Sequence, residues 1–197
     1  MFSIFQKTLL ALALACSSAV ALAGPNYHVS VSTAGYTGAG YLDFSVVGTA
    51  GAPGAVASIS NLSGDFGVEA ERVGAVAGAI PAGFTLTNAA GDNYLTQAIN
   101  FGGLFTFDIS FAGEYESVEG IDGATFVIGL YDALFSQYTL VADFAAQPRT
   151  DVSDSSLTAT AHLPAVSIEA LHAVPEPSEL ALVLTTLLAA GAALRRR

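Results

Sequence analysis

The chain of 197 residues contains no tryptophan, a single cysteine and few basic residues. Because the cysteine, Cys16, lies near the N-terminus, the rest of the chain has no disulfide partner and must be stabilised by packing alone. Residues 24–173 contain two cations, Arg72 and Arg149, against fifteen carboxylates, which gives this region a formal charge of −13. A surface of this charge repels nucleic acid and anionic lipid headgroups, so we exclude both as partners of this region.

The sequence also lacks the residue patterns that support common catalytic mechanisms. It has no G-x-S-x-G segment, and its histidines, His28, His162 and His172, lie far apart in the sequence. His28 and His162 occupy the polar side of strand-like segments, where we expect solvated side chains, and we expect His172 to lie in a linker. No H-x-x-x-H or C-x-x-C pair is present to bind zinc. We therefore predict that the protein is not an enzyme.

The N-terminus has the order of a secretory signal peptide. Lys7 precedes an apolar run over residues 9–16, and a stretch of small residues ends in Ala21, Leu22 and Ala23 before Gly24. This A-x-A pattern predicts export through the Sec translocon and cleavage after residue 23. An uncleaved anchor is one alternative, but the apolar run is too short to span a bilayer. A lipoprotein modified at its cysteine is the other.

The C-terminus combines a short apolar run with a basic cluster. Residues 180–194 carry no charge, and as a helix these fifteen residues would extend about 22 Å, short of the roughly 30 Å core of a bilayer. Arg195, Arg196 and Arg197 follow directly and can extend their guanidinium groups to the membrane surface. Because arginines favour the cytoplasmic side, we expect a short transmembrane helix with the preceding chain outside the cytoplasm. The alternative, a buried helix of the globular domain, is disfavoured because no polar stripe interrupts the run.

A proline-rich motif stands immediately before this run. Its residues are Val174, Pro175, Glu176, Pro177 and Ser178. Together with the apolar run and the arginines, the motif resembles the PEP-CTERM sorting signal of Gram-negative bacteria. The resemblance implies transient membrane insertion, cleavage near the motif by an exosortase, and release to the cell surface or into extracellular polysaccharide. The two prolines fit this role, because they keep the segment extended and accessible to a protease.

Between these two ends, residues 24–173 form about 150 residues of strand-like sequence, the size of one domain. Side chains alternate most clearly in residues 104–111, where apolar and polar residues take turns. Similar alternation predicts strands over residues 27–31, 42–46, 56–62, 84–88, 126–130, 140–144, 157–163 and 166–170. We therefore predict an all-β, antiparallel β-sandwich, of which a jelly roll is one form, flanked by the signal helix and the short transmembrane helix.

The apolar positions of two of these strands predict a shared core. Its expected members are Phe105, Phe107, Ile109, Phe111, Phe126, Ile128 and Leu130. The segments YHVSV, GYLDFSV, ASISNLSG and FVIGLYD also resemble a recurrent group of PEP-CTERM proteins. That resemblance implies a secreted domain and supplies no active-site residues.

One acidic segment is a candidate metal site. Glu114, Glu116, Glu119 and Asp122 place four carboxylates within nine residues between two strong strands. Ca²⁺ takes six to eight oxygen ligands and could hold such side chains together, although the spacing differs from that of an EF-hand. A solvated loop is the simpler alternative. A pair of carboxylates for glycoside hydrolysis is disfavoured, because nothing fixes the gap between opposing residues. Apart from calcium, we predict no cofactor.

These observations leave two functions for the exported domain. The first is a structural or interaction role at the bacterial surface or in the extracellular matrix, which the sorting signal favours. The second is a carbohydrate-binding module, calcium-assisted or not, associated with exopolysaccharide, because tyrosine rings can stack on sugars. The candidate tyrosines are Tyr36, Tyr41, Tyr94, Tyr115 and Tyr131. The absence of tryptophan counts against the second function, because most sugar-binding platforms of this kind use tryptophan. A planar, exposed row of tyrosine rings on one sheet would favour the second function, and its absence would favour the first.

Overall fold

The computed structural model describes residues 24–89 and 91–171. The described chain from Gly24 to Leu171 is one compact unit. The predicted signal peptide, proline-rich motif, transmembrane helix and arginine cluster lie outside the described residues, as does His172. Within the described part of the chain, no helix is long and apolar enough to cross a membrane.

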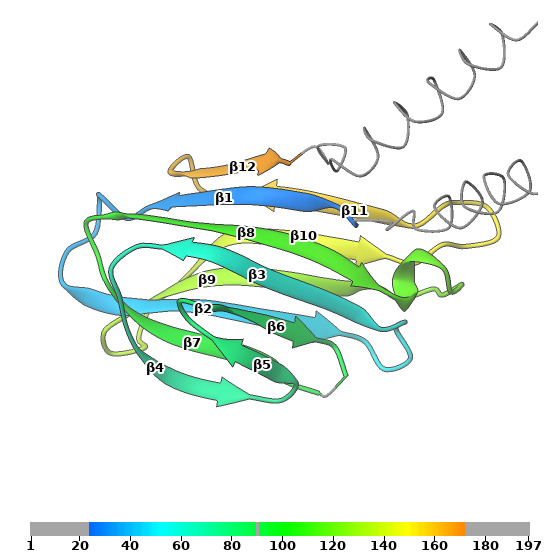
Figure 1. Ribbon diagram of the computed structural model, residues 1–197, viewed down its shortest axis with the longest axis horizontal. Helices are drawn as coiled ribbons and strands as arrows, with labels where there is room; N and C mark the ends of the chain where they lie inside the picture. The colour runs from blue at the N-terminus through cyan, green and yellow to red at the C-terminus, as the bar shows by residue number, and fades with distance from the viewer. Residues whose placement is uncertain (1–23, 90, 172–197) are drawn as a thin grey trace, which may run out of the picture. The chain divides into compact units, whose positions relative to one another are not determined.

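The described residues form twelve β-strands and one short 3-10 turn. The strands are β1 (Asn26–Ser32), β2 (Ala39–Gly48), β3 (Ala55–Ser63), β4 (Phe66–Val73), β5 (Val76–Ala79), β6 (Gly83–Thr87), β7 (Asn93–Asn100), β8 (Leu104–Gly113), β9 (Ala124–Asp132), β10 (Tyr138–Gln147), β11 (Ser156–Ala161) and β12 (Val166–Ala170), and the turn η1 (Glu114–Glu116) follows β8. They build two six-stranded sheets, ordered β12-β1-β8-β3-β6-β5 and β11-β10-β9-β2-β7-β4 (Figure 1). The strands within both sheets pair antiparallel, so the predicted all-β sandwich is confirmed.

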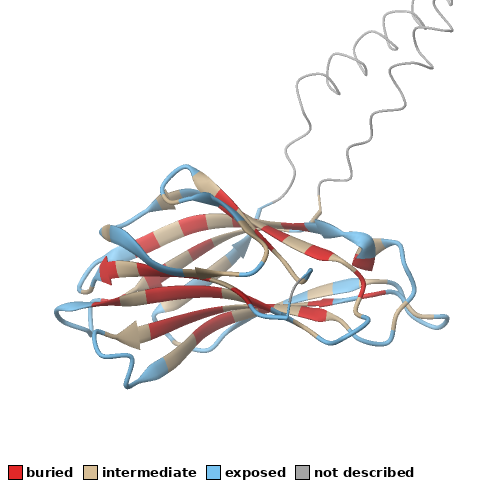
Figure 2. Ribbon diagram, turned by 90° about the horizontal axis from the view of Figure 1, so that it is seen from below, coloured by how far each residue is buried: buried red, intermediate tan, exposed pale blue. Residues whose placement is uncertain are grey.

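The core lies between the two sheets, and buried residues alternate with more exposed ones along the strands of both layers (Figure 2). The residues predicted for it are all at most 3% exposed: Phe105, Phe107, Ile109 and Phe111 from β8, and Phe126, Ile128 and Leu130 from β9. Phe44 of β2 joins the layers, because its ring packs edge-on against Phe84 at 5.1 Å and Phe107 at 5.4 Å between ring centroids. Each such side chain contributes roughly 1.5–3 kcal/mol by leaving water.

Three strands, β4, β5 and β7, were not predicted from the sequence. Strand β4 is an exposed edge strand, and its pairing with β7 shifts register twice, so its side chains do not alternate cleanly. Strand β5 has four residues, Val-Ala-Gly-Ala, which give almost no pattern. Strand β7 buries the polar residues Asn93, Thr96 and Gln97, which breaks the alternation of polar and apolar positions.

Candidate functional site

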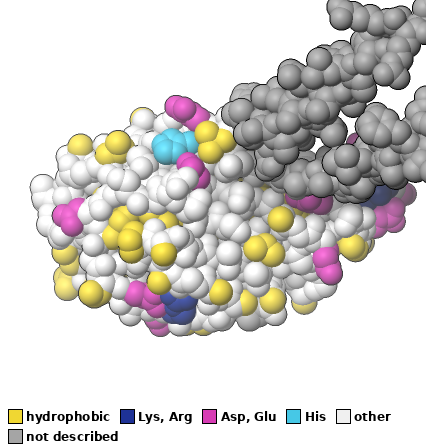
Figure 3. Space-filling model, in the orientation of Figure 1, with side chains coloured by type: hydrophobic (Ala, Val, Ile, Leu, Met, Phe, Trp, Pro, Cys, Tyr) yellow, Lys and Arg dark blue, Asp and Glu magenta, His cyan; other side chains and the backbone are white. Residues whose placement is uncertain are grey.

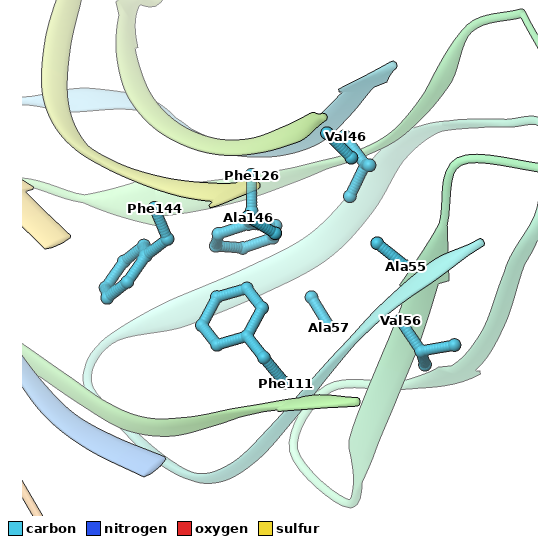
Figure 4. A pocket seen from close by; sticks show the side chains of 9 residues that line it. Val46, Ala55, Val56, Ala57, Phe111, Phe126, Phe144 and Ala146 are labelled. Atoms are coloured by element: carbon cyan, nitrogen blue, oxygen red, sulfur yellow. The ribbon is translucent and has the colours of Figure 1, made fainter. Parts of the chain in front are cut away.

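One small cavity lies inside the sandwich and is not a binding site. Its volume is about 10 Å³, room for roughly one water molecule. Figure 4 shows the rings of Phe126 and Phe144 from the second sheet facing Phe111 and Ala57 from the first. A space this small between apolar side chains offers a ligand no polar partner, so we attribute it to imperfect packing of the core.

A larger concavity of about 370 Å³ lies on the outer face of the second sheet. Its lining residues are Asp43 and Ser45 of β2, Glu71 of β4, Tyr94 and Thr96 of β7, Tyr131 of β9, and Phe135 of the β9–β10 turn. The strands place these side chains outward, because they alternate with β2 residues such as Leu42 and Phe44 that are fully buried in the core. We call this concavity, together with Tyr41 and Tyr138 beside it, the tyrosine site.

The register of three neighbouring strands aligns three tyrosines beside this concavity. Tyr41 of β2 pairs with Tyr131 of β9, and Tyr131 pairs in turn with Tyr138 of β10. The rings of Tyr131 and Tyr138 lie 4.8 Å apart between centroids. Tyr138 is 47% exposed, so part of this ring is free to contact a ligand. Of these three rings only Tyr138 is exposed, and it is tilted by 49° to Tyr131, so the sheet aligns the tyrosines in a row but does not present them as one flat, exposed platform.

The turn between β9 and β10 adds Phe135 to this row. Phe135 has a left-handed backbone, with φ of 54°, and its ring stacks on Tyr41 at 4.2 Å and 20°. Asp132 fixes the turn, because its Oδ1 accepts hydrogen bonds from the backbone N–H of Ser136 at 2.7 Å and of Gln137 at 3.2 Å. The hydrogen bond from the Ser136 hydroxyl, with those from the backbone, lowers the pKa of Asp132 and keeps it charged. Phe135 is 49% exposed and offers a second open ring.

Gly129 allows Tyr138 to lie close to the sheet. A Cβ at this position would stand 2.1 Å from Cε2 of the Tyr138 ring, far inside an ordinary contact. Gly129 also pairs with Asp43 of β2, so the glycine brings the Tyr138 ring beside that carboxylate. The missing side chain thus leaves room for the Tyr138 ring beside the concavity.

Asp43 is the buried charge of the tyrosine site. It is 8% exposed, and the Thr96 hydroxyl donates a 2.6 Å hydrogen bond to its Oδ1. No described residue donates a hydrogen bond to the other oxygen, Oδ2. Burial raises the pKa of Asp43 above its usual value, and the nearby Glu71 carboxylate adds to the rise.

The charge of Asp43 contributes to raised pKa values of the tyrosines around it. Loss of solvation, an interaction with the Glu71 carboxylate and the charge of Asp43 together raise the pKa of the Tyr94 hydroxyl. Desolvation, followed by the charge of Asp43, likewise raises the pKa of Tyr131 and of Tyr138. Three phenols therefore remain neutral hydrogen-bond donors around one carboxylate at physiological pH.

Sequence reasoning named three of the site's tyrosines, Tyr41, Tyr94 and Tyr131. The other two candidate tyrosines lie elsewhere. Tyr36, in the β1–β2 loop, packs on Phe101, and Tyr115 is buried at 2% exposure. It missed Asp43, Phe135 and Tyr138. The alternation within GYLDFSV predicts that Asp43 faces outward as a polar residue. It does not predict that Asp43 is buried, because the burial depends on neighbouring strands.

The four acidic candidates do not come together as a metal site. Glu114 lies in η1, where its Oε2 accepts a 3.3 Å hydrogen bond from the backbone N–H of Gly54, and Glu119 forms a backbone bridge with Arg149. Glu116 buries one oxygen without a hydrogen-bond partner. Among the described residues, which include these three and Asp122, no group of three or more His, Cys, Asp or Glu side chains is arranged to hold a metal ion. The geometry therefore gives the calcium hypothesis no support.

Both described histidines lie on strands or their edges and pair with aspartates. Nδ1 of His28 lies 2.6 Å from Oδ1 of Asp108, and Nε2 of His162 lies 2.6 Å from Oδ2 of Asp143. Burial raises the pKa of Asp108, but hydrogen bonds from Asn61 and then His28 outweigh it, so this pKa is lowered. Figure 3 shows one histidine close to carboxylates on the viewed face and very few basic side chains.

No family model, no curated protein and no solved structure matches the chain.

Proposed function

We propose that the sandwich is a glycan-binding module of an exported bacterial surface or matrix protein. The single observation that carries this proposal is the alignment of Tyr41, Tyr131 and Tyr138, with Phe135, beside the unpartnered oxygen of Asp43. Aromatic rings bind the apolar C–H faces of sugar rings, while a few fixed polar groups orient the hydroxyls. The tyrosine site offers both kinds of contact within one concavity.

The geometry supports glycan binding over a purely structural role. A structural role needs a stable fold but gives no reason for two half-exposed rings, Phe135 and Tyr138, to be held beside each other on an outer face. The Asp132 turn and the bare Gly129 hold these rings in position. A preformed site loses less conformational entropy when a ligand binds. Tyrosine here takes the part that tryptophan plays in many sugar-binding surfaces.

The strand order also supports the proposal. The first sheet contains the run β1-β8-β3-β6 and the second contains β2-β7-β4, so that β1, β2, β3 and β4 alternate between the two sheets. This order supports a jelly-roll arrangement, an architecture that lectin domains also use.

The two ends of the chain supply the proposed location. We propose export through the Sec translocon, cleavage after Ala23, transient anchoring by residues 180–194 with Arg195, Arg196 and Arg197 on the cytoplasmic side, and release by an exosortase at the proline-rich motif. The released protein would then encounter extracellular polysaccharide, which is the class of ligand that the tyrosine site fits. We propose binding rather than catalysis, because the site offers aromatic faces beside two carboxylates, Asp43 and Glu71, and none of the described histidines lines it.

The experiment is retention of the purified full-length protein, in mild detergent, in gels that contain a panel of glucans, galactans or the producing organism's own exopolysaccharide. We expect retardation by at least one neutral polysaccharide, reduced in Tyr131→Ala and Tyr138→Ala. Tyr36→Ala is the matched control, because this ring packs on Phe101 away from the row. Free migration in every gel, or an equal loss in the control, would contradict the proposal.

A further inference from the structure

The charged side chains at the tyrosine site are all negative. Asp43 and Glu71 both line it, and the charge of Asp92 also reaches Tyr94. The cation nearest in sequence, Arg72, lies opposite the core residue Leu95, whereas Glu71 lies opposite Thr96, so Arg72 is on the other side of the strand. An uncompensated negative charge therefore faces any ligand that enters the tyrosine site.

The Arg72 guanidinium is already occupied by other partners. Nε and Nη2 donate hydrogen bonds to the two carboxylate oxygens of Glu69, at 2.8 and 2.6 Å. Nη1 and Nη2 also donate to the backbone oxygens of Val76 and Gly78, at 3.3 and 2.8 Å. A bidentate pair that is also bonded to backbone has little freedom to turn toward Asp43.

Asp43 can accept a further hydrogen bond from a ligand. The residue is 8% exposed and lines the tyrosine site, Thr96 donates to its Oδ1, and Oδ2 accepts no hydrogen bond from the described residues. A carboxylate that is largely removed from water is unfavourable as a charge, and a ligand that brings a positive donor compensates that charge and adds a hydrogen bond. The neighbouring rings add to the attraction, because the faces of tyrosine and phenylalanine attract cations.

We propose that the tyrosine site recognises a glycan with protonated amino groups, that is, a polymer containing amino sugars without their acetyl groups. This inference rests on the proposed glycan-binding function and narrows its ligand class. The sugar ring stacks on Tyr138 or Phe135, and its ammonium group donates to Oδ2 of Asp43. Uronic acid polymers are disfavoured, because their carboxylates would face Asp43 and Glu71.

The test compares oligosaccharides that share one backbone and differ in charge. Affinities of the full-length protein in detergent are measured by calorimetry for hexamers of β-1,4-linked glucosamine, its N-acetylated form and glucose, and for a glucuronate oligomer. We expect the glucosamine hexamer to bind roughly tenfold more tightly than its acetylated form, in the range of one cation–π contact joined to one ion pair. The glucuronate oligomer should bind most weakly.

Two variants assign this preference to the tyrosine site. Asp43→Asn keeps the size of the side chain and removes its charge, so it should abolish the preference for the glucosamine hexamer over its N-acetylated form. Asp151→Asn, an exposed residue of the β10–β11 loop, removes the same charge elsewhere and should change nothing. Should Asp43→Asn fail to fold, Glu71→Gln replaces it, because Glu71 is exposed and should lower the preference without disturbing the core.

The outcomes separate this inference from the function on which it rests. Equal affinity for the glucosamine and N-acetylated hexamers overturns the amino-sugar inference and leaves glycan binding intact. A preference that falls equally in Asp43→Asn and Asp151→Asn also overturns it, because general attraction to an acidic protein then explains the result. Failure to bind any oligomer or polysaccharide overturns both.

Discussion

Replacing Gly129 with alanine tests the tyrosine site without removing any aromatic ring. The new Cβ would stand 2.1 Å from Cε2 of Tyr138, whereas carbon atoms in contact lie about 3.5–4 Å apart. The ring must therefore move by roughly 1.5 Å or more. Because Tyr138 is 47% exposed, it can swing toward solvent rather than strain the sheet. We expect the displaced ring to lose its contact with Tyr131 and its place beside Asp43.

The expected effects on stability and on binding are of different size. Loss of the Tyr131–Tyr138 contact costs about 0.5–1.5 kcal/mol, while replacing glycine by alanine in an extended backbone recovers about 0.4–1 kcal/mol. The free energy of unfolding should therefore change by no more than about 1 kcal/mol. Glycan affinity should fall by up to about tenfold, the effect of losing roughly 1.4 kcal/mol of ligand contact.

The assay combines urea unfolding with glycan affinity for Gly129→Ala, Tyr138→Ala and the double variant. If the alanine acts only by moving the ring, it should have no further effect on affinity once Tyr138 is gone. Unchanged affinity in Gly129→Ala, together with a clear loss in Tyr138→Ala, would refute the reasoning about ring position. A loss of stability above about 3 kcal/mol would show that the sheet, rather than the ring, absorbs the clash.

Three further predictions concern the core, the buried carboxylate and the sorting motif. Phe107→Ala should lower the free energy of unfolding by about 3–5 kcal/mol in chemical denaturation, because its fully buried ring contacts Phe44 and no disulfide adds to the stability of the domain. A loss under about 1 kcal/mol would contradict the assignment of Phe107 to the core. Asp43→Asn should become progressively more stable than the parent as pH rises from the ordinary carboxyl range to neutrality. The reason is that the raised pKa of Asp43 means that its ionisation lowers the free energy of unfolding of the parent. Thermal unfolding across pH checks this, and a parallel pH dependence of both proteins would contradict it. Changing Pro175, Glu176 and Pro177 to alanine should leave an uncleaved protein that stays in the membrane. Intact mass of the protein in the medium and membrane fractions measures this. A variant that reaches the medium at the parent's mature mass would disprove the sorting proposal.

The sandwich was predictable because its central strands are buried on one face and polar on the other. Strand β8 shows this most simply, since Phe105 and Phe107 enter the core while Thr106 and Asp108 face outward. Strand β7 could not be recognised in this way, because its buried polar residues form hydrogen bonds with neighbouring strands and turns. Gln97, for example, donates a 2.7 Å hydrogen bond to the backbone oxygen of Gly67 in β4.

The tyrosine site was predictable only in part, because it depends on register. Alternation placed Tyr41 and Tyr131 on polar faces, but nothing in the sequence fixes which residues of β10 lie opposite β9. The register shifts between Leu140 and Ala142, and this irregularity lies close to the end of β10 that brings Tyr138 opposite Tyr131. The position of Phe135 depends likewise on a left-handed turn held by Asp132. Such features arise from contacts between strands rather than from local sequence.

The most direct test of glycan binding uses the tyrosines themselves as reporters. The chain has seven tyrosines, and NMR of protein with labelled tyrosine rings can follow each during titration with the polysaccharide or oligosaccharide that binds best. We predict shifts concentrated in the ring signals of Tyr41, Tyr94, Tyr131 and Tyr138, with Tyr36 and the buried Tyr115 unchanged. Shifts confined to Tyr36 or Tyr115, or no shift in any ring at saturating ligand, would contradict the assignment of the tyrosine site as a glycan-binding surface.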